Sequence, residues 1–391
     1  MAITGPLSGV RVLDLSQAHA GPYGTQLLGD MGAEIIKIEP ANGEVMRFMW
    51  PSHEGMSYYI LALNRNKKAI VLDLKSESGK QALHDLIKVS DVIIDNREIG
   101  VMEKLGADYE TAKKLNPRII SCSITGYGPT GPYAHLPSYD IIPLGMSGIV
   151  SLTGEPDRMP VRPGIALADL SGGFFGAMGV VNALYGRERT GEGCKVEVNL
   201  LDSCMSLMSS IFQDHFISGK VPGPQGSRHT LVPLLGIYPT QDGYITIGPS
   251  WPRIAKVLDV EWMITDPRFA GGIMMRAEHR KDMEDILEEA LKKHTTEDWL
   301  EVMRVEGIAA GPVYSVDQVL EDPQIIHNQI VQEVEHPKYG KVRVIGSPIK
   351  MPGVIEGENT APPTLGEHTD EVLKDLLGYS EEQITAVKQS K

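Results

Sequence analysis

Alternation of apolar, strand-like runs with helix-like stretches is the feature that most constrains the fold of this chain. The runs VRVLDL at 10–15 and EIIKIE at 34–39 flank a stretch that is typical of a loop and then a helix. This spacing predicts parallel strands joined by a crossover helix. Three further runs continue the pattern, at 69–75, 91–96 and 118–125. Together they favour a doubly wound, Rossmann-like α/β domain, which binds ligands beyond the carboxyl ends of its strands.

A second pattern begins after the breaker-rich segment VPGPQGSRHTLVP at 221–233. Residues 237–247 predict a hairpin that turns at Asp242-Gly243, and residues 281–294 carry apolar side chains at helical spacing. Residues 295–298 (TTED) resemble the capping signal of a following helix, and a last helix is expected at 370–377. Before the breaker, residues 200–217 predict one long, methionine-rich helix. We therefore expect a large domain over residues 1–222, joined by the C-terminal segment 317–391, and a small α+β domain over residues 223–316.

Composition excludes several classes of function. The 391 residues carry a formal net charge of −14, which disfavours general binding of nucleic acid. The start of the chain has no basic segment followed by an apolar core, so we expect a cytoplasmic protein. The longest apolar run, at 174–185, predicts no membrane span, being short and rich in glycine. The three cysteines lack CxxC spacing and the histidines lack paired spacing, so we expect no metal site.

The stretch IALADLSGGFFGAMGVVNALYGR at 165–187 carries the best candidate for chemistry. It predicts a short strand, a turn at 169–173 and an apolar helix. Asp169 falls at the helix start, where unpaired N–H groups and the helix dipole keep a carboxylate ionised. The glycines at 172 and 173 leave space for another molecule to approach the backbone. Such a carboxylate suits covalent acyl transfer, although most aspartates at helix starts only cap the helix.

Two other patterns allow alternative interpretations. GYGPTG at 126–131 matches the G-x-G-x-x-G fingerprint of dinucleotide-binding proteins, but prolines stand where the helix should begin, so we interpret it as a turn-rich loop. A group of basic residues is either a solvated face or a phosphate-binding rim. It contains Arg65, Lys67, Lys68 and Lys75, with Lys37 and Lys104 as companions.

Many segments, in the same order, resemble the family III CoA-transferases over about residues 6–373. They include PLSGVRVLDLSQ, LLGDMGAEIIKIEP, NRNKKAIVLDLK, GYGPTGPY, ALADLSGGFFGAMG and PPTLGEHTDEVL. The resemblance implies an interlocked homodimer that moves coenzyme A from an acyl-CoA donor to a small carboxylic acid. It implies no metal, and it implies that Asp169 is the nucleophile, forming an aspartyl anhydride and then an aspartyl-CoA thioester.

The resemblance also assigns roles to other residues. Gln17 matches a glutamine near the reacting carbonyl, which suits a donor to the oxyanion, and Tyr139 matches an active-site tyrosine. Positions that resemble the CoA-binding ones are Lys37, Lys75, Asn96 and Lys104. Glu98 replaces a common arginine of the family, so one phosphate contact is either lost or supplied by Arg97. Residues 247–252 are short and stiff where some members have a glycine-rich lid.

Three alternatives remain open on the sequence. An α-methylacyl-CoA racemase resembles these transferases but has a histidine where this chain has Tyr139, and a neutral tyrosine is a poor base near pH 7. A non-catalytic CoA-binding subunit is the second, and a nicotinamide dehydrogenase is the third. Arg228 is a candidate partner for a second substrate carboxylate, against the alternative of a charge in a linker.

Overall fold

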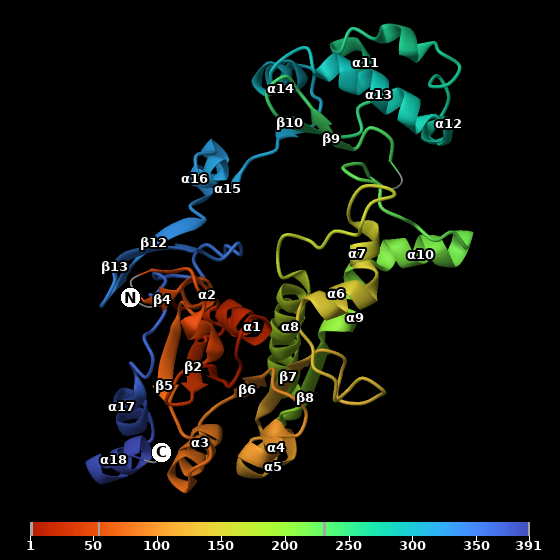
Figure 1. The fold of residues 1–391 in the computed structure, drawn as a ribbon. Helices are drawn as coiled ribbons and strands as arrows, with labels where there is room; N and C mark the ends of the chain where they lie inside the picture. The colour runs from red at the N-terminus through yellow and green to blue at the C-terminus, as the bar shows by residue number, and fades with distance from the viewer. Residues whose placement is uncertain (1–2, 54, 230–231, 390–391) are drawn as a thin grey trace. The chain divides into compact units, whose positions relative to one another are not determined.

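A computed structural model describes residues 3–53, 55–229 and 232–389, which form two compact units (Figure 1). The first unit comprises Met1–Ser147, Gly164–Ser209 and Gln324–Lys391. The second comprises Gly148–Pro163 and Ser210–Pro323. The chain therefore passes from the first unit to the second twice.

A six-stranded parallel sheet forms the centre of the first unit. Its strands, in chain order, are β1 (Arg11–Asp14), β2 (Glu34–Glu39), β5 (Lys67–Val71), β6 (Val92–Asp95), β7 (Ile120–Thr125) and β8 (Lys195–Asn199). Their order across the sheet is β5-β2-β1-β6-β7-β8, and every neighbouring pair is parallel. The order reverses direction between β1 and β6, so residues 15–19 and 96–100 emerge side by side at the carboxyl edge. The five predicted strands are confirmed, whereas β8 was not predicted.

Helices cover both faces of this sheet. On one face, buried residues of the strands pack against α3 (Glu77–Lys88), α4 (Val101–Leu105), α5 (Tyr109–Leu115) and the C-terminal helices. The C-terminal part has a helical turn at Thr369–Glu371, a π-helix at Val372–Leu376 and α18 (Glu381–Gln389). On the opposite face, α8 (Leu167–Thr190) lies against β7 and beside α1 (Ala20–Gly29) (Figure 1). One prediction is wrong here, because no strand precedes α8. The predicted C-terminal helix is confirmed as a continuous helical segment that changes from α to π type at Val372.

Glycines bring α1 and α8 into backbone contact. A Cβ added to Gly24 of α1 would lie 2.8 Å from the carbonyl oxygen of Gly173, and one added to Gly173 would overlap the carbonyl oxygen of Ala20. A Cβ on Gly172 would overlap the side chain of Leu200, at the start of α9. These glycines therefore serve close packing of helices and not, as predicted, the approach of another molecule.

We expect Gly173→Ala to lower the free energy of unfolding by about 1–3 kcal/mol, because the added methyl group meets backbone that cannot turn away. Gly186→Ala is the matched control in the same helix, since an added Cβ there has no neighbour within 4 Å. The control should be neutral or stabilising by about 0.5–1 kcal/mol, because alanine favours a helix over glycine. Urea unfolding of both variants checks this, and equal effects would contradict the packing argument.

Helix α8 also bears on membrane association. In the described part of the chain it is the one helix long and apolar enough to cross a bilayer, contrary to the prediction that no run suffices. Core helices of soluble proteins pass the same test, and 44% of its most apolar window is buried inside the structure. The remaining face exposes Phe174, Met178, Val181 and Tyr185, which are three or four residues apart and so share one stripe.

The second unit is built around a three-stranded antiparallel sheet. Its strands are β9 (Gly236–Pro239), β10 (Tyr244–Ile247) and β11 (Ala310–Pro312), in the order β11-β10-β9. Three helices complete this unit's core, namely α11 (Arg253–Val257), α13 (Arg280–Leu291) and α14 (Thr296–Val305). The short helix α12 (Ile273–Glu278) has no buried residue. The predicted hairpin and helix are confirmed, as is the cap of α14, where Thr295 and Asp298 form a capping box.

The remaining elements are short. The predicted long helix is two helices, α9 (Leu200–Leu207) and α10 (Ser209–Ser218), broken at Met208 where the chain leaves the first unit. Other elements are α2 (Tyr58–Leu63), α6 (Ile141–Ser147), α7 (Ile149–Leu152), α15 (Val316–Val319), α16 (Pro323–Asn328) and the hairpin of β12 (Val331–His336) and β13 (Gly340–Ile345). Residues 126–131 begin no helix, so the interpretation of GYGPTG as a loop is confirmed.

Candidate active site

The turn between β1 and α1 is fixed from beneath by a buried carboxylate, Asp14. Its Oδ1 accepts hydrogen bonds from the N–H and hydroxyl of Ser16, and its Oδ2 accepts one of 2.7 Å from Thr25. Lys67 Nζ lies 3.0 Å from Oδ2. Burial opposes ionisation, but Lys67 and Lys37 together hold the pKa of Asp14 well below its usual range. Asp14 is thus a charged structural support.

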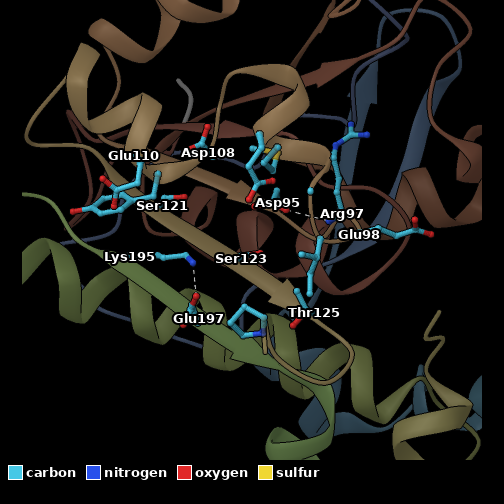
Figure 2. A pocket seen from close by; sticks show the side chains of 16 residues that line it. Asp95, Arg97, Glu98, Asp108, Glu110, Ser121, Ser123, Thr125, Lys195 and Glu197 are labelled. Carbon is cyan, nitrogen blue, oxygen red and sulfur yellow. Dashed lines mark hydrogen bonds and ion pairs between the residues drawn. The ribbon is translucent and has the colours of Figure 1, made fainter. Parts of the chain in front are cut away.

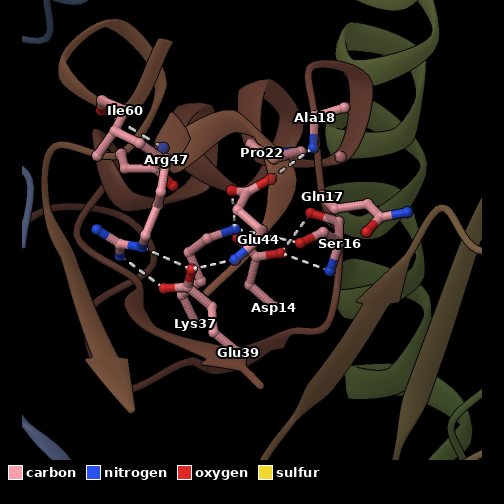
Figure 3. A network of polar contacts seen from close by, with 12 residues as sticks. Asp14, Ser16, Gln17, Ala18, Pro22, Lys37, Glu39, Glu44, Arg47 and Ile60 are labelled. Atoms are coloured by element: carbon pink, nitrogen blue, oxygen red, sulfur yellow. Dashed lines mark hydrogen bonds and ion pairs between the residues drawn. The ribbon is translucent and has the colours of Figure 1, made fainter. Parts of the chain in front are cut away.

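Lys37 belongs to the same buried network and not to a phosphate site. Its side chain is 0% exposed, its Nζ lies 2.8 Å from Glu44 Oε1, and it donates a 3.1 Å hydrogen bond to the carbonyl oxygen of Ser16 (Figure 3). Burial opposes the charge, but Glu44 and Asp14 outweigh it and raise the pKa of Lys37. The prediction that Lys37 contacts CoA is therefore wrong, because the ammonium group is enclosed and already paired.

Of the two interpretations of the basic group, the phosphate-binding rim fails for three further residues, because each is already paired with a carboxylate. Arg65 pairs with buried Asp30, Lys67 with Asp14, and Lys68 with both Glu34 and Glu371. The side chain of Lys75 is exposed.

Glu44 and Asn96 hold the exposed part of the turn. Glu44 Oε2 accepts a 2.7 Å hydrogen bond from the N–H of Ala18, whose φ of +60° is in the left-handed region (Figure 3). Asn96, directly after β6, accepts a 2.9 Å hydrogen bond from the N–H of Gln17 and donates one of 2.8 Å to its carbonyl oxygen. The structure therefore brings the predicted residues Gln17 and Asn96 together, with the side chain of Gln17 exposed.

Arg97 and Lys104 lie further along the same edge. Arg97 Nε donates a 3.0 Å hydrogen bond to the carbonyl oxygen of Leu15, and Lys104 is exposed on α4. A cavity of about 170 Å³ lies beside Arg97 against β7 (Figure 2). Its lining holds six carboxylates but only two basic residues, and one of these, Lys195, pairs with Glu197. Burial raises the pKa of Asp95 in this lining to about 6. This cavity suits a polyphosphate poorly.

Asp169 lies in the first turn of α8 without capping it. The cap is Asp140, whose Oδ1 accepts hydrogen bonds of 2.9 Å from the N–H of Ala168 and 3.3 Å from the N–H of Asp169. The carboxyl group of Asp169 is left for another use, and its Oδ2 lies 3.8 Å from His19 Nδ1. His19 precedes α1, so the close packing of α1 on α8 brings these two side chains together.

The pKa of Asp169 differs from the sequence-based expectation. Burial, with a contribution from the negative charge of Asp140, raises this pKa to about 7, so the carboxyl group is not held ionised by the helix start. Burial lowers the pKa of His19, although Asp140 opposes the change. Sequence reasoning missed His19, because a single histidine without a spaced partner carries no local signal.

Tyr139 and Arg228 complete the predicted residues. Tyr139 directly precedes the capping residue Asp140, and its side chain is 77% exposed. Arg228, in the second unit, lies 3.3 Å from Glu284 and 3.1 Å from Glu288 and stacks 3.9 Å from the ring centre of Tyr238. The prediction that Arg228 receives a substrate carboxylate is wrong, because two carboxylates of its own unit already neutralise it.

Comparison with known proteins decides the family. The model of CoA-transferase family III matches residues 7–369. The chain belongs to CoA-transferase family III. The CoA-transferase is 36% identical over 382 residues to the succinyl-CoA:glutarate CoA-transferase of Mus musculus, covering 96% of this chain and 87% of the relative. It is 34% identical to the succinate–glutarate CoA-transferase of Agrobacterium fabrum, covering 95% and 96%.

A solved structure agrees with this assignment. The CAIB/BAIF family protein from Brucella suis is 32% identical and superimposes with a TM-score of 0.86, over 95% of this chain and 99% of that one. The expected resemblance to family III, the transferase function and the mixed α/β architecture with its parallel sheet are confirmed.

Proposed function

We propose that this CoA-transferase works through covalent intermediates on Asp169. The carboxylate attacks the carbonyl carbon of the donor thioester, the C–S bond breaks, and CoA leaves as a thiolate while a mixed anhydride remains. The thiolate then attacks the aspartyl carbonyl carbon, giving aspartyl-CoA thioester and releasing the donor acid. An acceptor carboxylate runs both steps in reverse. Thioester is exchanged for thioester, so no ATP is needed.

The observation that supports this proposal is that two aspartates at the start of α8 have different roles: Asp140 caps the helix, and Asp169 does not. Asp140 occupies the free N–H groups of the helix, so the nearby Asp169 carboxyl group has no capping duty. Its side chain is 21% exposed and can therefore meet a substrate. Gln17 and Tyr139 present exposed side chains for the acyl group, and we keep both as proposed catalytic residues.

We infer that the substrates are small dicarboxylic acids and their CoA thioesters. Relatives from three organisms are named for such acids: succinate with glutarate in two, and succinate with D-citramalate in the Chloroflexus aurantiacus protein, which is 34% identical. The exposed Lys75 and Lys104, together with Arg97, are the proposed partners of the CoA phosphates. Asn96 contributes by holding the turn on which Gln17 stands.

We also propose that the protein is a homodimer and that it is located in the cytoplasm. The apolar stripe on α8 supports the homodimer, because soluble proteins seldom leave such a contiguous apolar surface uncovered. The strand order with its switch point between β1 and β6 supports the Rossmann-like description of the large domain. The proposed domain limits are residues 1–222 with 317–391 for the large domain and residues 223–316 for the small one. The two compact units described above differ from them, because Gly148–Pro163 and the stretches 210–222 and 317–323 belong to the second unit.

Intact-protein mass spectrometry after incubation with succinyl-CoA tests the covalent cycle. We expect a CoA adduct that hydroxylamine removes, because an aspartyl thioester is susceptible to this nucleophile. Peptide mapping should place the adduct on Asp169, with Asp140 unmodified. Absence of an adduct, combined with entry of solvent deuterium into a 2-methylacyl-CoA, would instead establish the racemase alternative.

A further inference from the structure

The side chain of His19 lies close to that of Asp169. Its Nδ1 lies 3.8 Å from Asp169 Oδ2, and the two side chains are 18% and 21% exposed. The imidazole ring stands edge-on to Tyr59, with 5.5 Å between ring centres and an angle of 84° between planes. The ring is therefore bounded on one side by α2 and on the other by the start of α8.

The backbone that precedes His19 is fixed by hydrogen bonds on two sides. Glu44 binds the N–H of the preceding residue, Ala18, and Lys37 neutralises Glu44 from the interior. On the other side, Asn96 binds both backbone groups of Gln17. The histidine thus stands on a turn fixed from two directions, as a group placed against a reacting atom must be.

We propose that His19 is the proton partner of Asp169. This inference rests on the proposed covalent cycle at Asp169. When the thioester binds, the proton of the Asp169 carboxyl group passes to His19 Nδ1, which leaves a carboxylate and an imidazolium. The carboxylate oxygen forms its bond to the thioester carbon, the C–S bond breaks, and the CoA thiolate departs beside the imidazolium. The imidazolium stabilises the thiolate until it attacks again, and the proton returns to Asp169 at the end of the cycle.

The distance and the surrounding charges fit this role. A gap of 3.8 Å is longer than a hydrogen bond, and catalytic hydrogen bonds of this kind commonly shorten when substrate binds. In the described part of the chain, the titratable groups around His19 are Asp169, Asp140 and Tyr59, with Glu44 behind the turn. Asp140 is engaged with two backbone N–H groups, so its negative charge stabilises an imidazolium while its oxygen is occupied.

The pH dependence of adduct formation separates this role from a structural one. In the native enzyme, the pair works with one shared proton, so the rate of loading by succinyl-CoA should rise and then fall as pH increases. In His19→Asn, one ionisation remains, that of Asp169, and the rate should rise to a plateau without a falling limb. At pH 7 the loading rate should be about 10²-fold below that of the native enzyme.

His135→Asn is the matched control, because His135 is an exposed histidine in another loop of the same unit. Its rate and pH profile should equal those of the native enzyme. A His19→Asn enzyme that keeps both the rate and the falling limb would overturn the proposal.

A second measurement does not depend on turnover. NMR titration of protein labelled with ¹⁵N-histidine compares the pKa of His19 in the native protein and in Asp169→Asn. The pKa should be higher in the native protein, because the Asp169 carboxylate attracts the imidazolium and the asparagine does not. An unchanged titration in Asp169→Asn would overturn the pairing. If the native protein formed no adduct, the covalent cycle would fail, and the titration would still decide whether His19 and Asp169 share a proton.

Discussion

Replacing Asp169 with alanine should reduce the rate of CoA transfer by roughly 10⁴-fold or more, because the variant lacks the atom that bonds to the acyl group. Binding of CoA should persist, since the residues proposed to contact its phosphates lie in the loop after β5, in the loop after β6 and on α4. The measurement is transfer from succinyl-CoA to glutarate, followed by chromatography of both thioesters, together with the mass of the protein after incubation.

Two further variants make this result specific. Asp169→Asn keeps the shape of the side chain and should be equally inactive, since an amide is a poor nucleophile. Glu188→Ala removes a carboxylate from the other end of the same helix, where Glu188 is exposed and pairs with Arg118 at 3.5 Å. That variant should transfer CoA at the native rate. Transfer by Asp169→Ala at more than a few per cent of the native rate would show that the covalent intermediate forms elsewhere.

Replacing Lys37 with methionine should lower the free energy of unfolding by about 3–5 kcal/mol, because it leaves the carboxylate of Glu44 buried without its partner. The Ala18 turn would lose its support at the same time, since that carboxylate also accepts the N–H of Ala18. Urea unfolding measures the first effect. Combining Lys37→Met with Glu44→Gln should recover part of the loss, because the second change removes the unpaired charge.

Lys68→Met is the matched control, one residue along from Lys67 on the neighbouring strand β5. Lys68 pairs with Glu34 at 3.0 Å and Glu371 at 2.8 Å, but its side chain is 36% exposed. Its loss should cost about 0–1 kcal/mol, as is usual for exposed ion pairs. A Lys37→Met protein with native stability and a raised KM for acyl-CoA would restore the original prediction that Lys37 binds the cofactor.

Much of the fold could be predicted from local sequence patterns. The parallel strands were found because strands buried on both faces are continuous apolar runs, and the cap of α14 because Thr295 and Asp298 lie three residues apart. Strand β8 was missed because it has only five residues, KVEVN, although their alternation of polar and apolar side chains is the pattern of a half-buried strand. The break between α9 and α10 was missed because residues 200–217 contain neither glycine nor proline.

The candidate site was less accessible to sequence reasoning, because its pairings are distant in the chain. Asp169 stood out through its place at a helix start and through the family resemblance. Lys37 was misassigned because nothing in EIIKIE shows that Glu44 turns back beneath the strand. His19 and Asp169 are 150 residues apart, and they meet because glycines let α1 and α8 touch. Such contacts depend on tertiary packing, which local patterns do not report.

In the turn after β1 and beside it, the residues that hold the backbone differ from the residues that present side chains to a substrate. The backbone of the turn is anchored by the buried Asp14 and Glu44 and by the half-buried Asn96, while Gln17 and the distant Tyr139 reach the solvent with side chains that carry none of this support. Support and reactivity are therefore carried by different side chains of this site. Substitution of Gln17 or Tyr139 should lower the rate of CoA transfer and leave the free energy of unfolding nearly unchanged, because neither side chain holds the turn that aims the reactive carboxyl group.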